Sequence, residues 1–83
     1  KSVKIIYPTK NLHIISTRDL HAKNALIVQV ANLKDENLFW YLNKALIYEG
    51  KDRSKEFHLK AGKYELFIIS QSGQSDEVSF WVE

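Results

Sequence analysis

Apolar and polar positions alternate with a period of two over most of this chain, which is the pattern of half-buried β-strands. In the segment 24–31, for example, Leu26, Val28 and Val30 fall on one face. Short stretches of polar residues, Gly or Pro separate the apolar segments. About seven or eight strands are predicted, at residues 3–7, 12–16, 24–31, 38–42, 45–48, 55–59, 64–69 and 78–82. Short antiparallel strands at this spacing are typical of an all-β, two-sheet sandwich.

Two spacings make the predicted sandwich immunoglobulin-like. Tyr64 follows Gly62 at the start of a strand, as in a tyrosine corner, where a Tyr hydroxyl bonds to backbone a few residues upstream. An ordinary edge tyrosine is the alternative interpretation. Trp40 comes twelve residues after Val28, the distance from the first Cys to the core Trp of an antibody-type domain. Val28 and Leu66 would then stand at the two cysteine positions of that fold.

Period two also separates inward from outward side chains. The predicted core is Leu26, Val28, Leu38, Trp40, Leu42, Phe57, Leu59, Leu66, Ile68, Val78, Phe80 and Val82. The opposite face of the same strands is also apolar, with Phe39, Tyr41, Phe67, Ile69 and Trp81. In an immunoglobulin-like sandwich the Trp strand and the last two strands are neighbours, so these five side chains would cluster. A large exposed apolar patch usually marks an interaction site, and we predict one here.

Two alternatives to this interaction surface remain open at the level of sequence. The segment 45–48 or the N-terminal segment could fold over the outward aromatic residues. The register could also differ by one residue, which would exchange the two faces of a strand.

Composition restricts the chain to one small domain. Its 83 residues have room for a single core and no deep cleft. The chain has no cysteine, so disulfides, thiolate metal sites and cysteine nucleophiles are excluded. The net charge is +2, and the densest charged segment, residues 51–56, alternates in sign. We interpret that segment as a solvated loop and expect no nucleic-acid partner.

No catalytic motif is present. The sequence contains no Ser-x-x-Lys, Lys-Thr-Gly or Gly-x-Ser-x-Gly pattern. His13, His21 and His58 lie in separate segments without ligand spacing. Asp76 and Glu77 are adjacent, so in a strand they point to opposite faces and would not form an acid–base pair. We therefore expect a non-catalytic domain without metal or cofactor.

Five segments, in order along the chain, carry a resemblance to a known family. They are Ile6-Tyr7-Pro8, Arg18-Asp19-Leu20-His21-Ala22, Leu38-Phe39-Trp40-Tyr41-Leu42-Asn43, Ala61-Gly62-Lys63-Tyr64-Glu65-Leu66-Phe67-Ile68-Ile69 and Val78-Ser79-Phe80-Trp81-Val82. Together they resemble the C-terminal accessory domain of bifunctional (class A) penicillin-binding proteins of the 1C type. The chain departs from that pattern at Ala22 and Lys44, where glycine is common, and at Ser70, where Asp is usual, while Gly73 keeps the loop glycine.

The resemblance implies a periplasmic or otherwise extracytoplasmic domain of a membrane-anchored peptidoglycan glycosyltransferase–transpeptidase, a cell-wall synthase. Residues 1–83 would form one accessory domain within that longer protein, and its role would be to position the enzyme or bind a partner. The partner would be the neighbouring transpeptidase domain, a separate periplasmic protein or a second copy of the domain. The alternatives are a carbohydrate- or peptidoglycan-binding module that stacks sugars on Tyr41 and Trp81, and an immunoglobulin-like spacer of another secreted bacterial protein.

Overall fold

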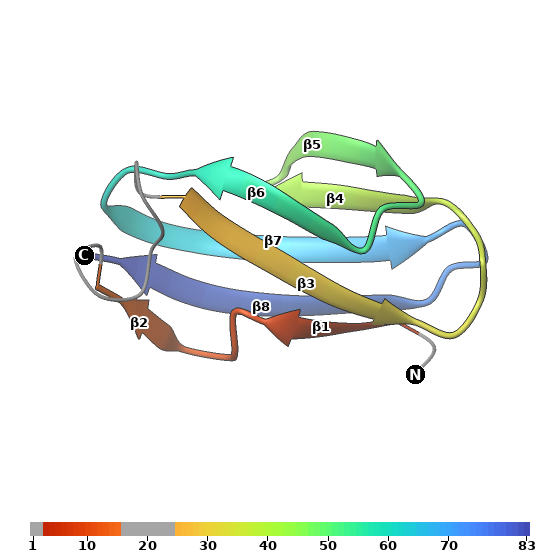
Figure 1. The fold of residues 1–83 in the computed structure, drawn as a ribbon, viewed down its shortest axis with the longest axis horizontal. Coiled ribbons are helices and arrows are strands. Elements are labelled where there is room, and N and C mark those ends of the chain that lie inside the picture. Colours follow the sequence, from red (N-terminus) through yellow and green to blue (C-terminus); the bar gives the residue numbers. More distant parts are fainter. Residues whose placement is uncertain (1–2, 16–24) are drawn as a thin grey trace.

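The computed structural model describes residues 3–15 and 25–83, and in these residues the chain forms eight strands and no helix (Figure 1). The strands are β1 (Val3–Tyr7), β2 (Leu12–Ile14), β3 (Ala25–Asn32), β4 (Leu38–Leu42), β5 (Ala45–Gly50), β6 (Ser54–His58), β7 (Gly62–Ser70) and β8 (Ser75–Val82). Every segment that the alternating pattern marked as a strand contains one, and the ends differ by a few residues.

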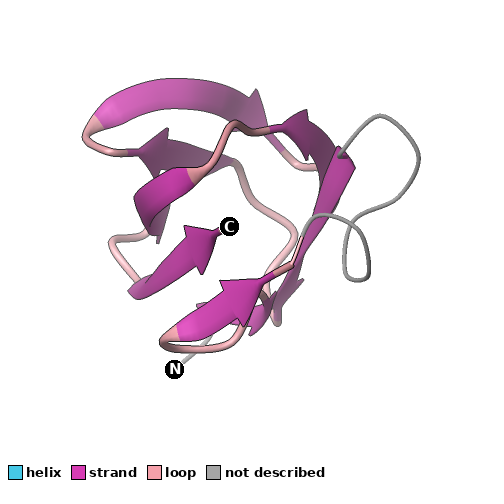
Figure 2. Cartoon of the chain, turned by 90° about the vertical axis from the view of Figure 1, so that its left-hand side faces the viewer, coloured by secondary structure: helices cyan, strands magenta, loops and turns pink. Residues whose placement is uncertain are grey.

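The strands form two sheets that enclose a common interior (Figures 1 and 2). One sheet has three strands in the order β1-β3-β6, and the other has five in the order β2-β8-β7-β4-β5. The predicted immunoglobulin-like sandwich is therefore confirmed, and the Trp strand β4 lies in the same sheet as the last two strands, next to β7. The alternation of apolar residues explains why both sheets have one face directed to the interior.

The expectation that all strands are antiparallel is wrong for one pair. Strand β2 runs parallel to β8, with Leu12 opposite Phe80 and Ile14 opposite Val82. The N-terminal segment contributes to both sheets, since β1 pairs with β3 and β2 then joins the other sheet beside β8. The direction of β2 is thus set by the direction in which the chain arrives from β1, which an alternating pattern does not encode.

The core lies between the sheets and contains most of the residues expected there. Of that set, the residues buried in the structure are Leu26, Val28, Leu38, Trp40, Leu66, Ile68, Val78, Phe80 and Val82. Leu42, Phe57 and Leu59 are only partly buried and pack against the core from its margin, because they lie on edge strand β6 or at the ends of strands. The core also contains Val3, Ile5, Ile14 and Val30, which the predicted core omitted.

Trp40 links the two sheets at the centre of the core. Its side chain is 0% exposed. Tyr48 of β5 meets the indole edge-on, with ring centroids 5.6 Å apart, and Phe57 of the other sheet lies 5.9 Å away. Contacts from both sheets therefore depend on the Trp40 ring, and aromatic side chains of this size bury a large apolar area in a core.

A tyrosine hydroxyl fixes the backbone at the crossing from β6 to β7. Tyr64 donates a hydrogen bond from its hydroxyl to the carbonyl oxygen of Lys60 at 2.7 Å. Its ring stacks on Phe80, with centroids 5.6 Å apart. This is the hydrogen bond of a tyrosine corner. Gly62, with φ of 156°, provides the turn between these residues.

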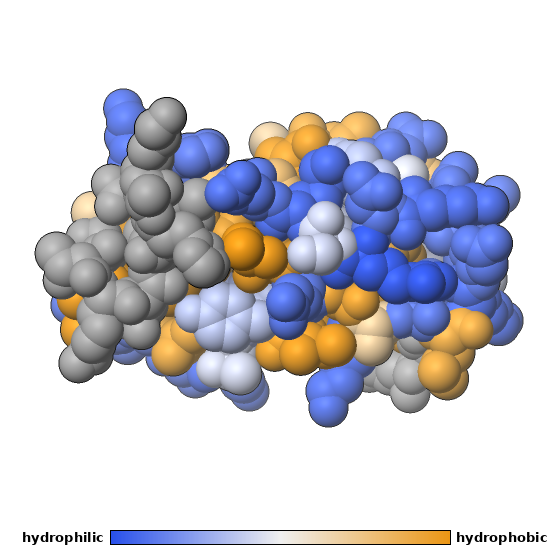
Figure 3. Space-filling model, viewed as in Figure 1, coloured by the Kyte–Doolittle hydropathy of each residue, from blue (hydrophilic) through white to orange (hydrophobic). Residues whose placement is uncertain are grey.

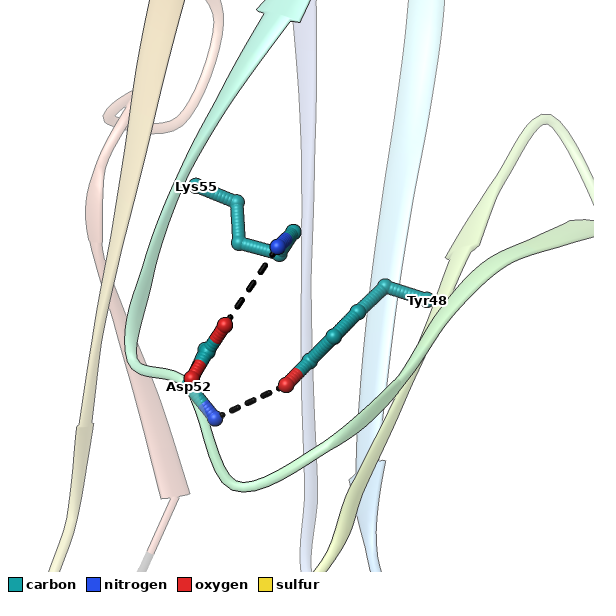
Figure 4. Close-up of polar contacts among 3 residues, drawn as sticks. All are labelled: Tyr48, Asp52 and Lys55. Carbon is teal, nitrogen blue, oxygen red and sulfur yellow. Dashed lines mark hydrogen bonds and ion pairs between the residues drawn. The ribbon is translucent and has the colours of Figure 1, made fainter.

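A second tyrosine has the same role at the crossing from β5 to β6 (Figure 4). The hydroxyl of Tyr48 accepts a hydrogen bond from the backbone N–H of Asp52 at 3.0 Å. The ammonium of Lys55 lies 4.4 Å from the centre of the Tyr48 ring and 3.3 Å from Asp52 Oδ2.

The interpretation of residues 51–56 as a loop was wrong in part, because β6 begins at Ser54. Alternating charge fits an edge strand as well as a solvated loop.

Replacing Tyr64 with phenylalanine is expected to lower the free energy of unfolding by about 1 kcal/mol, because one hydrogen bond is lost while the ring packing is kept. Urea denaturation of the two proteins measures this difference. An unchanged denaturation midpoint would show that the hydrogen bond to Lys60 contributes nothing to stability.

Candidate functional site

Four large side chains form a compact group on the outer face of the five-stranded sheet. Phe39 lies directly opposite Ile69, and Tyr41 lies opposite Phe67 on the neighbouring strand. The Tyr41 and Phe67 rings are 6.2 Å apart and tilted by 46°. All four side chains are partly buried, because each packs against its neighbours on the face. We call this group the aromatic face.

Leu46 extends the aromatic face onto strand β5, although the alternating pattern did not mark it as a surface residue. A register irregularity between Trp40 and Tyr41 places Leu46 opposite Tyr41. Leu46 is 51% exposed. The segment 45–48, which was one candidate to cover this face, instead lies beside β4 as the next strand of the sheet. The N-terminal strands lie in the other sheet (β1) and at the far edge beside β8 (β2).

Trp81 points to the same side of the sheet but is separate from the aromatic face. On β8 it lies four residues beyond Glu77, the residue opposite Phe67, which is roughly 13 Å along the strand. The His13 ring stacks on the indole at 4.7 Å, and the Lys63 ammonium lies 5.4 Å from its centre. The structure thus groups four of the five predicted surface residues and gives Trp81 its own partners.

The separation of Trp81 from the aromatic face is relevant to the alternative in which Tyr41 and Trp81 both stack on sugars. His13 comes from β2 and Lys63 from β7, so the indole is flanked by neighbours from both adjoining strands. His13 is held in place by Glu83, whose Oε2 lies 2.7 Å from Nδ1. The two aromatic rings therefore lie apart on the sheet, and His13 already covers one face of the indole.

A shallow hollow of about 450 Å³ lies in the surface at the aromatic face. It is lined by Tyr41, Lys44, Glu65, Phe67, Ile69 and Glu77. Glu77 lies directly opposite Phe67, and Glu65 precedes Phe67 by two residues on the same face. In the part of the chain that the structure describes, neither carboxylate forms an ion pair with a basic side chain.

The turn between β4 and β5 is tied to strand β7 at one end of the hollow. Asn43 donates its backbone N–H to the carbonyl of Glu65, and its side-chain Oδ1 accepts the N–H of Glu65, both at 2.8 Å. Asn43 and Lys44 have φ of 50° and 70°, the positive values of a two-residue hairpin turn. These contacts set Lys44 and Glu65 at the rim.

A polar network fixes the opposite end, where the β7–β8 loop meets the segment before β4. Glu36 Oε1 accepts hydrogen bonds from the hydroxyl of Ser72 at 2.7 Å and from its backbone N–H at 3.2 Å. The pKa of Glu36 lies below its ordinary value, mainly because of the hydrogen bond with the Ser72 hydroxyl and next because of the one with the Ser70 hydroxyl. The aromatic face is therefore bounded at both ends by loops fixed through hydrogen bonds.

The outer face of the three-stranded sheet has a different character (Figure 3). Hydrophilic side chains cover much of it, and the apolar atoms between them form smaller groups. Among its exposed residues, Ile6 is a single large apolar side chain at 50% exposure. The two faces of the sandwich therefore differ in chemistry, and the aromatic residues are concentrated on the five-stranded sheet.

The titratable residues considered in the sequence analysis do not gather into a reactive centre in residues 3–15 and 25–83. His13 and His58 lie in different sheets, and His21 falls outside the described residues. The two carboxylate oxygens of Asp76 accept the backbone N–H groups of Ile5 and Glu77 at 2.8 and 2.9 Å. No group of three potential metal ligands occurs within the described ranges.

The described residues include no helix with the length and apolar character needed to span a membrane. The turn Arg18–Ala22 of the family resemblance also falls among residues that the structure does not describe.

Comparison with known proteins gives a fold and a family. A solved fibronectin(III)-like module of CbhA from Clostridium thermocellum superposes with a TM-score of 0.64, covering 96% of this chain and 92% of that one. The two share 14% sequence identity, so this likeness concerns the fold. No curated protein sequence matches the chain. Residues 1–80 match the Penicillin-Binding Protein C-terminus Family, which agrees with the resemblance carried by the sequence motifs. Since the match extends over almost the whole chain, the protein belongs to that family of penicillin-binding-protein C-terminal domains.

Proposed function

We propose that this domain is a non-catalytic interaction and positioning domain of a peptidoglycan glycosyltransferase–transpeptidase, and that it docks through the aromatic face. The observation that carries the proposal is a cluster of large apolar side chains on the outer face of a sheet whose inner face already fills the core. The docking partner is the neighbouring transpeptidase domain. Membership of the penicillin-binding-protein family supports an extracytoplasmic address in a membrane-anchored parent protein.

The aromatic face has the properties of a protein-binding surface. Aromatic residues are enriched in interfaces and carry much of their binding energy. Lateral packing between Tyr41 and Phe67 restricts their rotamers before any partner binds, which lowers the entropy lost on association. The fixed loops at both ends keep the strands beneath them in place.

The test replaces Tyr41 and Phe67 together with serine and measures binding of the 83-residue chain to the transpeptidase domain of the same polypeptide. We expect the dissociation constant to rise at least about tenfold, since two aromatic anchors are removed. The control replaces Ile6 and Leu33, which are 50% and 86% exposed and lie away from the aromatic face, with serine. The control should bind like the original chain.

Unchanged binding by a folded Tyr41/Phe67 variant would overturn the docking proposal. If that variant unfolds, binding of Leu46→Asp is measured in its place. Leu46 is half exposed at the margin of the aromatic face, so its replacement should leave the domain folded. Loss of self-association instead of transpeptidase binding would assign the face to a homodimer. Binding of muropeptides at the same residues would assign it to peptidoglycan.

A further inference from the structure

Two carboxylates, those of Glu65 and Glu77, lie beside the Phe67 ring on the same face of the sheet. Glu77 is directly opposite Phe67, so their Cβ atoms are about 5 Å apart. Glu65 precedes Phe67 by two residues, roughly 7 Å along the strand. Glu65 and Glu77 are diagonal neighbours across β7 and β8 at about 7–8 Å. A group seated over the Phe67 ring is therefore within reach of both carboxylates.

This arrangement is complementary to a cation. The face of an aromatic ring attracts a positive charge, and a carboxylate forms a charge-assisted hydrogen bond with it. Tyr41 supplies a second ring 6.2 Å from Phe67. Glu65 and Glu77 have no basic partner in an ion pair among the residues described, so both carboxylates are available to a bound cation.

The charge balance of the hollow favours the same occupant. Its lining holds two carboxylates, Glu65 and Glu77, and one ammonium, that of Lys44. The chain as a whole has a net charge of +2. The lining of the hollow thus has a balance of one negative charge on a domain that is basic overall, so its attraction for a positively charged segment acts at short range.

We propose that the aromatic face binds a protein segment in which an arginine is flanked by apolar residues, with the guanidinium over Phe67 between Glu65 and Glu77. This inference rests on the proposed docking function and names the chemistry of the docking segment. Arginine fits better than lysine, because its planar group stacks on an aromatic ring while donating to two carboxylates. The apolar neighbours of the arginine pack on Tyr41 and Leu46.

The first experiment uses a capped peptide with one arginine between two leucines, and the same peptide with neutral citrulline in place of arginine. Each is titrated into the ¹⁵N-labelled 83-residue chain, to about 10 mM because single-residue contacts of this kind are weak. We expect shifts at the amides around Phe67, with the citrulline peptide bound about fivefold more weakly. Added salt should reduce that difference. No binding, or equal binding of the two peptides, overturns the inference.

The second experiment separates local from overall charge. Glu65→Gln with Glu77→Gln removes the two carboxylates of the hollow, and Asp35→Asn with Glu56→Gln removes two carboxylates outside its lining, from an exposed loop and from the three-stranded sheet. Only the first pair should weaken binding of the arginine peptide. Lys44→Gln should strengthen it, because the competing ammonium is removed. Urea denaturation confirms that each variant is folded.

Measured against the transpeptidase domain, these variants distinguish the two proposals. Suppose that Tyr41→Ser with Phe67→Ser weakens binding to the transpeptidase domain, but that the Glu65/Glu77 variant binds no more weakly than its control. The docking proposal then stands, and the proposed recognition of arginine is overturned. If neither set changes binding to the transpeptidase domain, the proposed function fails. The peptide titration then still decides whether the hollow binds arginine.

Discussion

Replacing Trp40 with alanine is expected to lower the free energy of unfolding by about 3–5 kcal/mol, the largest effect of any single change proposed for this domain. Trp40 is completely buried and contacts Tyr48 of its own sheet and Phe57 of the opposite one. Alanine would leave a cavity that two rigid sheets cannot close. Because small domains have a stability of roughly 5–15 kcal/mol, this variant should be largely unfolded in mild denaturant.

Trp81→Ala is the matched control, since it removes the same atoms from the outer face of the same sheet. Trp81 is partly exposed and stacks on His13, so we expect a smaller cost, below about 2 kcal/mol. Chemical denaturation followed by circular dichroism measures both variants. A larger loss for Trp81→Ala than for Trp40→Ala would contradict the assignment of Trp40 to the centre of the core.

Replacing Gly50 with alanine is expected to cost about 2–3 kcal/mol. Gly50 has φ of 157°, and a Cβ there would lie 2.8 Å from Cζ of Tyr48 and nearer still to its hydroxyl oxygen. The Tyr48 ring cannot move away freely, because it packs on Trp40 and its hydroxyl is hydrogen-bonded to Asp52. The methyl group would therefore disrupt the crossing between the sheets as well as strain the backbone.

Comparison with Gly62→Ala separates the cost of backbone strain from the cost of the contact with Tyr48. The φ of Gly62, 156°, is almost the same, but a Cβ there meets only Cε2 of Tyr64, at an ordinary 3.9 Å. The cost of Gly62→Ala should therefore be the backbone term alone, about 1–2 kcal/mol. Thermal or urea unfolding of both variants gives the difference. Equal losses at the two glycines would show that the contact with Tyr48 has no energetic effect.

Local sequence pattern was sufficient for the parts of the fold that depend on neighbouring residues. Period two assigned Leu38 and Trp40 to the core and Phe39 and Tyr41 to the outer face, because successive side chains of a strand point in opposite directions. The spacing of Gly62 and Tyr64 indicated a tyrosine corner for a similar reason, since that hydrogen bond spans only four residues. Order and spacing of the motifs were also enough to indicate the family.

Relations between distant strands were decided by the tertiary structure. The parallel pairing of β2 with β8 brought Ile14 into the core, and the irregularity beside Trp40 placed Leu46 next to Tyr41. The register of β7 and β8 set Glu77 beside Phe67 and moved Trp81 away to Lys63.

The sequence alone therefore determined that the chain forms an immunoglobulin-like sandwich with an apolar outer face. Only the tertiary structure decided which of those apolar side chains meet and which charges surround them. The physical reason is that the face of a residue follows from its local alternation, whereas its cross-strand neighbours depend on register and strand direction. Those are selected by the packing of the whole core and not by any one segment.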